Sequence, residues 1–130
     1  MDQLILILFF PSFFESFPSQ FFFYIQAPFF PIEATKKGAT PNQFGPVFGI
    51  TYLAQMCLAP IIGKIVANFG IGTPFKCSWI IYSVNITSFA FLSYINNTSN
   101  FLAVAYFLRF NQGIHGNVLW SSVLSILILW

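Results

Sequence analysis

The chain has 130 residues, of which 57% are hydrophobic and only 6% are charged, and its mean hydropathy is +0.77. A soluble domain carries about 25% charged residues, so this composition excludes a soluble globule and predicts an integral membrane protein in a lipid bilayer. The net charge of +2, with no basic cluster larger than Lys36-Lys37, is not that of a nucleic-acid-binding surface. Cys57 and Cys77 are too isolated for a disulfide framework or a CxxC metal pair.

Residues 4–31 form the first apolar stretch, which three prolines interrupt and Pro31 ends. Membrane helices tolerate prolines where neighbouring groups satisfy the freed backbone, so we predict one kinked spanning helix. Glu15 lies within this stretch and is a candidate group for binding a cationic solute or a coupling proton. The alternative is that Glu15 lies outside a span that begins later. Residues 32–43 hold three charges, a Gly and a Pro, and predict a polar loop.

Residues 44–68 predict the second span, in which Pro60 predicts a kink. Small residues recur four apart along it, and this spacing lets another membrane helix approach closely. The candidate helix-packing residues of this span are Gly45, Gly49, Ala59 and Gly63.

The Gly- and Pro-containing segment 69–75 predicts a tight turn, and residues 76–95 predict the third span. A polar turn over residues 96–100 leads into the fourth span, residues 101–130. The sequence therefore predicts an all-α membrane protein, with four transmembrane helices that alternate in direction across one bundle. Lysines are equally frequent on the two sides of the predicted spans, so the charge distribution leaves the orientation open.

The fourth span contains the segment Arg109-Phe110-Asn111-Gln112-Gly113-Ile114-His115-Gly116. Arg109 lies about 12 Å into the span, at about 1.5 Å per residue, and a charge at that depth is costly. It begins a ridge of small and polar residues at four-residue steps, namely Arg109, Gly113, Asn117, Ser121 and Ser125. Two interpretations are equally open: a helix-packing face with Gly113 and Gly116, or a solute pathway with Arg109 and Asn117.

His115 is a candidate proton relay because imidazole titrates near neutral pH, although a hydrogen-bonded structural role is the commoner one. The chain contains one histidine, so it has neither an HExxH metal motif nor a His-containing catalytic triad beside a positioned acid. Gly63-Lys64 is followed by Ile65 and is not a P-loop. We therefore expect no enzyme activity, no metal and no cofactor.

Three segments resemble the major facilitator superfamily. Arg109-x-x-Gln112-Gly113-x-x-Gly116 resembles the RxxQGxG-type motif of its fourth helix, and residues 63–70 resemble its GxLaDrxGrr loop, with Ala67 at the usual Asp. Residues 27–39, APFFPIEATKKGA, followed by residues 44–49, FGPVFG, are similar to the vesicular amine transporter branch, nearest its polyamine-transporting member.

The resemblance implies a carrier of twelve helices in two halves, of which this chain matches the N-terminal four. It implies proton-driven antiport of a small organic cation across a secretory or synaptic-type vesicle membrane, and a lumenal position for Lys36-Lys37. Glu15, Arg109, His115 and Asn117 then become candidates for the solute or proton pathway. The alternative is a truncated, transport-inactive membrane protein, or an accessory subunit that packs against a full-length carrier.

Overall fold

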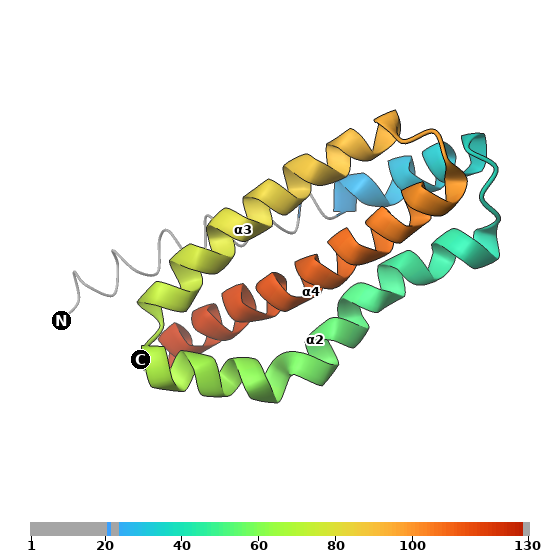
Figure 1. Ribbon diagram of the computed structural model, residues 1–130. Coiled ribbons are helices and arrows are strands. Elements are labelled where there is room, and N and C mark those ends of the chain that lie inside the picture. The colour runs from blue at the N-terminus through green and yellow to red at the C-terminus, as the bar shows by residue number, and fades with distance from the viewer. Residues whose placement is uncertain (1–20, 22–23, 129–130) are drawn as a thin grey trace.

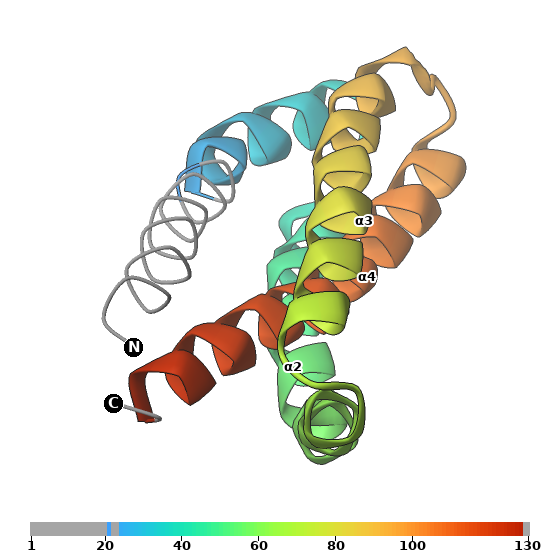
Figure 2. The same ribbon diagram turned by 90° about the vertical axis from the view of Figure 1, so that its left-hand side faces the viewer.

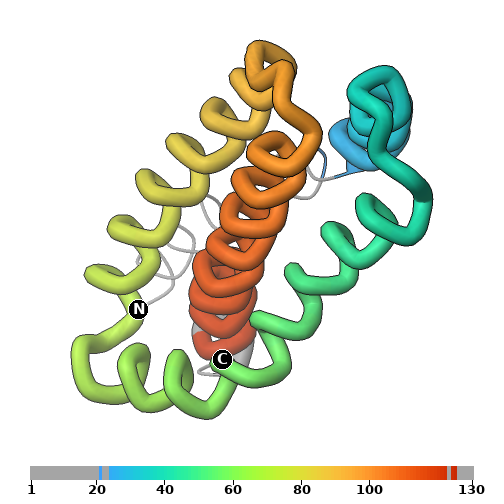
Figure 3. The backbone as a smooth tube through the Cα atoms, turned by 45° about the vertical axis from the view of Figure 1, so that its right-hand side comes forward, coloured from blue at the N-terminus to red at the C-terminus, as the bar shows by residue number. Residues whose placement is uncertain are grey.

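The computed structural model describes residue 21 and residues 24–128, and this part of the chain is helical without a β-strand. A first helix covers residues 24–36. It is followed by α2 (Pro41–Phe69), α3 (Gly72–Ala90), the 3-10 helix η1 (Phe91–Tyr94) and α4 (Thr98–Ile128). Short turns reverse the chain between consecutive helices, and α4 lies between α2 and α3 (Figures 1 and 3). The predicted all-α fold is confirmed.

The first helix extends past Pro31 to residue 36, so the prediction of a polar loop from residue 32 was wrong. A proline removes its own N–H and obstructs the preceding turn, but it leaves the following turn free to continue. The helix ends where Gly38, at φ 81°, donates its N–H to the Thr35 carbonyl and Ala39 donates to the Ala34 carbonyl. This is a Schellman motif, and its left-handed residue favours glycine. Residues 4–20 of the predicted span lie outside the described residues.

Both predicted turns are shorter than expected. α3 begins at Gly72, so the turn between α2 and α3 contains only Gly70, at φ 73°, and Ile71. α4 begins at Thr98 because the Asn97 side-chain oxygen accepts the N–H groups of Ser99 and Asn100, at 3.0 and 3.4 Å. These bonds satisfy donors that have no partner inside the helix, so a segment that looks like a polar turn starts a helix.

Helix α2 contains Pro46 and Pro60, and it bends along its length (Figures 1 and 3). Each proline removes an N–H from the helical ladder, which bends the helix at that point. The bend lets α2 follow α4, and the two helices run in the same direction.

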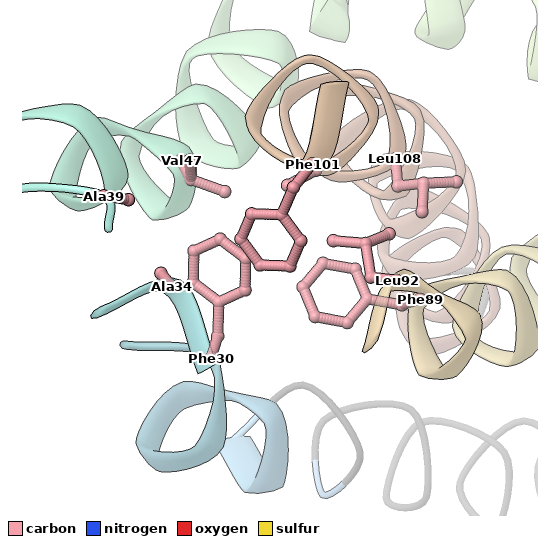
Figure 4. Packing of buried hydrophobic residues seen from close by; sticks show 9 residues of the cluster. Phe30, Ala34, Ala39, Val47, Phe89, Leu92, Phe101 and Leu108 are labelled. Carbon is pink, nitrogen blue, oxygen red and sulfur yellow. The ribbon is translucent and has the colours of Figure 1, made fainter. Parts of the chain in front are cut away.

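One apolar cluster joins all the described helices at the end of the bundle that carries the α3–α4 turn (Figure 4). The Phe30 ring of the first helix lies at its centre, stacked on Phe101 at 5.5 Å between centroids. Phe30 also contacts Phe89 at 5.5 Å and Phe48 at 5.6 Å. The remaining members are Ala34, Ala39, Val47, Leu92, Ala105 and Leu108.

Beside their apolar core, the described helices bury several polar side chains, and they expose many large apolar ones. Met56 is 78% exposed on α2, Ile80 is 62% exposed on α3 and Phe107 is 66% exposed on α4. The buried polar and charged side chains are Thr51, Ser78, Asn85, Arg109, Gln112 and Ser122. A water-soluble bundle has the opposite arrangement, with polar faces outside.

Among the described residues, one helix, α2, is long and apolar enough by length and composition to cross a membrane. Its most apolar window has a hydropathy of 1.6 and is 22% buried within the bundle. The membrane association predicted from the composition thus has support from α2, and the number of spans stays a prediction.

Candidate functional site

Arg109 is the largest fully buried side chain in the described part of the chain, with 0% exposure. It projects from α4 and contacts one aromatic ring on each of the two neighbouring helices. Its guanidinium carbon lies 4.6 Å from the ring centre of Phe48 on α2 and 4.5 Å from that of Phe89 on α3. Its Nη1 donates a hydrogen bond to Oε1 of Gln112, one turn further along α4, at 2.9 Å. Arg109 therefore connects three helices.

The surroundings of Arg109 offset part of the cost of burying a charge. Removing an ion from water costs several kcal/mol even after relaxation. A desolvated cation over an aromatic face regains up to about 2 kcal/mol per ring, and a charged donor to an amide oxygen adds about 1.5–3 kcal/mol. The paired rings and Gln112 thus stabilise the guanidinium inside the bundle.

Three further polar side chains are buried on the same helices, within one turn of the groups that contact Arg109. Thr51 on α2 and Asn85 on α3 are each 3% exposed, and Gln112 is 2% exposed. Within the described part of the chain, the Thr51 hydroxyl, both amide atoms of Asn85 and Nε2 of Gln112 are buried without a hydrogen-bond partner. Buried polar atoms in this state are destabilising and are characteristic of sites that bind water, ions or solutes. Together with Arg109 these residues form the buried polar layer.

The ridge predicted on α4 continues past this layer toward the C-terminal end of the helix, and Asn117 connects it to α2. Asn117 donates Nδ2–H to the Gln55 carbonyl at 2.8 Å, and Ser121 donates to the Asn117 side-chain oxygen at 3.3 Å. Ser125 bonds back to the Ser121 carbonyl at 2.8 Å, within its own helix. Asn117 therefore joins two helices.

His115 lies on the other side of α4, facing α3. Its Nδ1 is 3.4 Å from Oγ of Ser78, which is buried, while the imidazole is partly buried. The contact places the imidazole at the α3–α4 interface, one turn beyond Gln112.

The predicted small packing residues divide into two groups. A Cβ at Gly113 would overlap the Thr51 carbonyl oxygen and come within 2.9 Å of Ala54 Cβ, and one at Gly116 would lie 3.3 Å from Gln55 Nε2. These two glycines allow α4 to approach α2 closely. The other group faces away from the described helices: Ala59 is exposed, and a Cβ at Gly45, Gly49 or Gly63 would have no neighbour within 4 Å. Packing of that face against another helix stays a prediction.

A second polar contact, which the sequence does not predict, holds the end of the first helix. Lys37 donates Nζ–H to the carbonyls of Ser93 and Ile95, each at 2.8 Å, and lies 3.6 Å from Glu33 Oε1. Thr98 donates its hydroxyl to the Lys37 carbonyl. These bonds attach the first helix to the α3–α4 turn at one end of the bundle (Figure 2).

The sequence predicts Arg109 and Gly113 as site residues, but it does not predict Phe48, Phe89, Thr51 or Asn85. Asn85 is recognisable in the sequence as a lone amide in the apolar segment 76–95, whereas the two phenylalanines are indistinguishable from the chain's 17 others. Glu15 lies outside the described residues. In the described part, no group of three His, Cys, Asp or Glu side chains could hold a metal ion.

Comparison of the chain with protein-family models, curated proteins and solved structures finds no match. The resemblance to the major facilitator superfamily therefore rests on the three sequence segments described above.

Proposed function

We propose that this chain forms the first helices of a multi-pass membrane carrier that transports a small organic cation in exchange for protons. The observation that supports a membrane carrier best is the buried polar layer, in which Arg109 is enclosed by helices whose outer faces are apolar. Charged groups inside membrane helix bundles are rare, and they mark solute or ion pathways. The solute class and the proton coupling rest on the resemblance to the vesicular amine transporter branch.

The helix lengths suit a bilayer. A hydrocarbon core about 30 Å thick needs about 20 helical residues. α2 has 29 residues and α4 has 31, while α3 and η1 together cover residues 72–94. Three spans with alternating direction and the first helix would place Gly70-Ile71 on one side of the membrane and Lys37 with the α3–α4 turn on the other.

Arg109 would keep α2, α3 and α4 together during transport. Alternating access moves groups of helices largely as rigid bodies. A charge held by one ring from each neighbouring helix resists their separation, because the guanidinium would lose its cation–π contacts in a low-dielectric medium. Thr51, Asn85 and Gln112 supply hydroxyl and amide groups beside it, which are suited to binding water, a proton donor or an amine.

The proposal is tested in cells in which the gene that encodes this chain is edited. Every protein that contains the chain then carries the substitution. Uptake of labelled spermidine into their vesicles is measured with an imposed inside-acid gradient. Arg109→Lys keeps the charge but loses the planar guanidinium, and we expect uptake to fall about tenfold, which corresponds to about 1.4 kcal/mol. Lys36→Arg is the matched control, since the Lys36 side chain is 70% exposed. Normal uptake by Arg109→Lys at equal abundance in the membrane contradicts the proposal.

A further inference from the structure

We infer that Phe48 and Phe89 are positioning residues that clamp the Arg109 guanidinium between α2 and α3, and that Phe30 sets the spacing of the clamp. The clamp matters for transport only if the proposed function holds, but its existence is testable without any solute. The inference rests on ring contacts that connect the apolar cluster of the first helix to the buried charge.

The two clamp rings come from different helices. Phe48 on α2 and Phe89 on α3 lie at nearly equal distances from the guanidinium carbon, 4.6 and 4.5 Å. The guanidinium N–H groups point outward at the edge of its plane, and Nη1 donates to Gln112 at 2.9 Å. Two rings packed against the guanidinium from different helices restrict how it can turn, and therefore which acceptors its N–H groups can reach.

The clamp rings are in turn held by the first helix. Phe30, which is 4% exposed, contacts Phe48 edge-on at 5.6 Å and Phe89 at 5.5 Å. Figure 4 shows the Phe30, Phe89 and Phe101 rings directed toward one another between their helices. Because one ring touches both sides of the clamp, a displacement of the first helix changes the surroundings of Arg109 on α4.

Arg109 is the one arginine of the chain, which gives a specific chemical probe. Phenylglyoxal modifies accessible guanidinium groups, and peptide mass spectrometry of the membrane-bound chain then reports Arg109 alone. We expect slow modification of the unaltered chain. Phe48→Leu and Phe89→Leu keep an apolar side chain but remove the ring, and each should accelerate modification by roughly 5- to 30-fold, the factor given by one desolvated cation–π contact.

Aromatic replacement distinguishes a clamp from general packing. Phe48→Tyr keeps a ring face and should modify at a rate within about twofold of the unaltered chain, while Phe30→Leu should accelerate the reaction through both rings. Phe91→Leu on η1 and Phe107→Leu on α4 are the controls, since these side chains are 61% and 66% exposed, and both should leave the rate unchanged.

Three results overturn the inference: Leu variants that react as slowly as the unaltered chain, a Tyr variant as fast as its Leu counterpart, or control variants accelerated equally. Phe48 is half-buried, so its replacement disturbs the packing less than that of Phe89. If Phe89→Leu fails to insert into the membrane, Phe48→Leu still tests the inference. The 15Nε resonance of the single arginine provides a second measurement. It should move in each clamp variant and stay in place in Phe107→Leu.

Discussion

Gly113 of α4 lies against the backbone carbonyl of Thr51 on α2 so closely that no side chain fits between them. This contact determines how near the two parallel helices approach. It lies one residue from Gln112 and involves Thr51, so it is adjacent to the buried polar layer.

Gly113→Ala should destabilise the bundle by about 1–3 kcal/mol, because the added methyl would displace backbone atoms rather than a flexible side chain. Gly63→Ala on α2 is the matched control, since a Cβ there has no neighbour within 4 Å. Alanine exceeds glycine in helix propensity by about 1 kcal/mol, so Gly63→Ala should be neutral or stabilising. Unfolding in mixed micelles with increasing SDS, followed by circular dichroism, measures both variants. Equal stability of the two would show that α2 and α4 are further apart than described.

Lys37→Met should loosen the α3–α4 turn. Hydrogen bonds to charged groups contribute about 1.5–3 kcal/mol, and the Lys37 side chain is 10% exposed. Without its ammonium the carbonyls of Ser93 and Ile95 lose their donor, so amide hydrogen exchange over residues 91–98 should accelerate. Lys36→Met removes a neighbouring charge whose side chain is 70% exposed and should have little effect. Identical exchange in both variants would argue against this contact.

Asn85→Leu should stabilise the chain by about 1–3 kcal/mol. Both amide atoms of Asn85 are buried without a hydrogen-bond partner in the described part of the chain, and replacing such a group by an apolar one removes its desolvation cost. Ser83→Leu serves as a control on α3, because Ser83 bonds within its own helix. The same SDS titration applies. A destabilised Asn85→Leu would mean that Asn85 is hydrogen-bonded in the membrane-embedded protein. A stabilised variant that also lowers spermidine uptake would indicate that the amide is kept for function.

The sequence predicts the helices well and their ends less well. Composition and apolar segment length predict four helices because burial in lipid or protein requires long apolar runs. The helix ends depend on local bonds that composition does not reveal, such as the Asn97 cap and the Gly38 termination. The predicted helix end at Pro31 was wrong because the effect of a proline on the backbone is confined to the preceding turn.

The candidate site was predictable only in part. Arg109 is conspicuous as the one charge in the apolar segment 101–130, and Gly113 follows from its spacing. The clamp rings are not predictable in this way, because they lie 61 and 20 residues away in the chain and their directions depend on how their helices rotate about their axes. In a chain with 19 phenylalanines, sequence alone does not distinguish a ring that faces Arg109 from one that faces outward.

If the bundle crosses a bilayer with its apolar faces in lipid, the thiol of Cys57 lies in the hydrocarbon core and is the best position at which to probe this. Cys57 is exposed on α2. It lies 16 residues after Pro41 and 12 before Phe69, which is about 24 and 18 Å from the two helix ends at about 1.5 Å per residue.

Membranes containing the Cys77→Ala variant are treated with a charged, membrane-impermeant maleimide. A Cys57→Ala, Cys77→Ala, Asn96→Cys variant reports the exposed turn before α4. Cys57 should stay unlabelled until SDS is added, since the charged maleimide does not enter hydrocarbon. Asn96→Cys should be labelled at once on membranes opened to both sides. Rapid labelling of Cys57 in intact membranes would contradict the account.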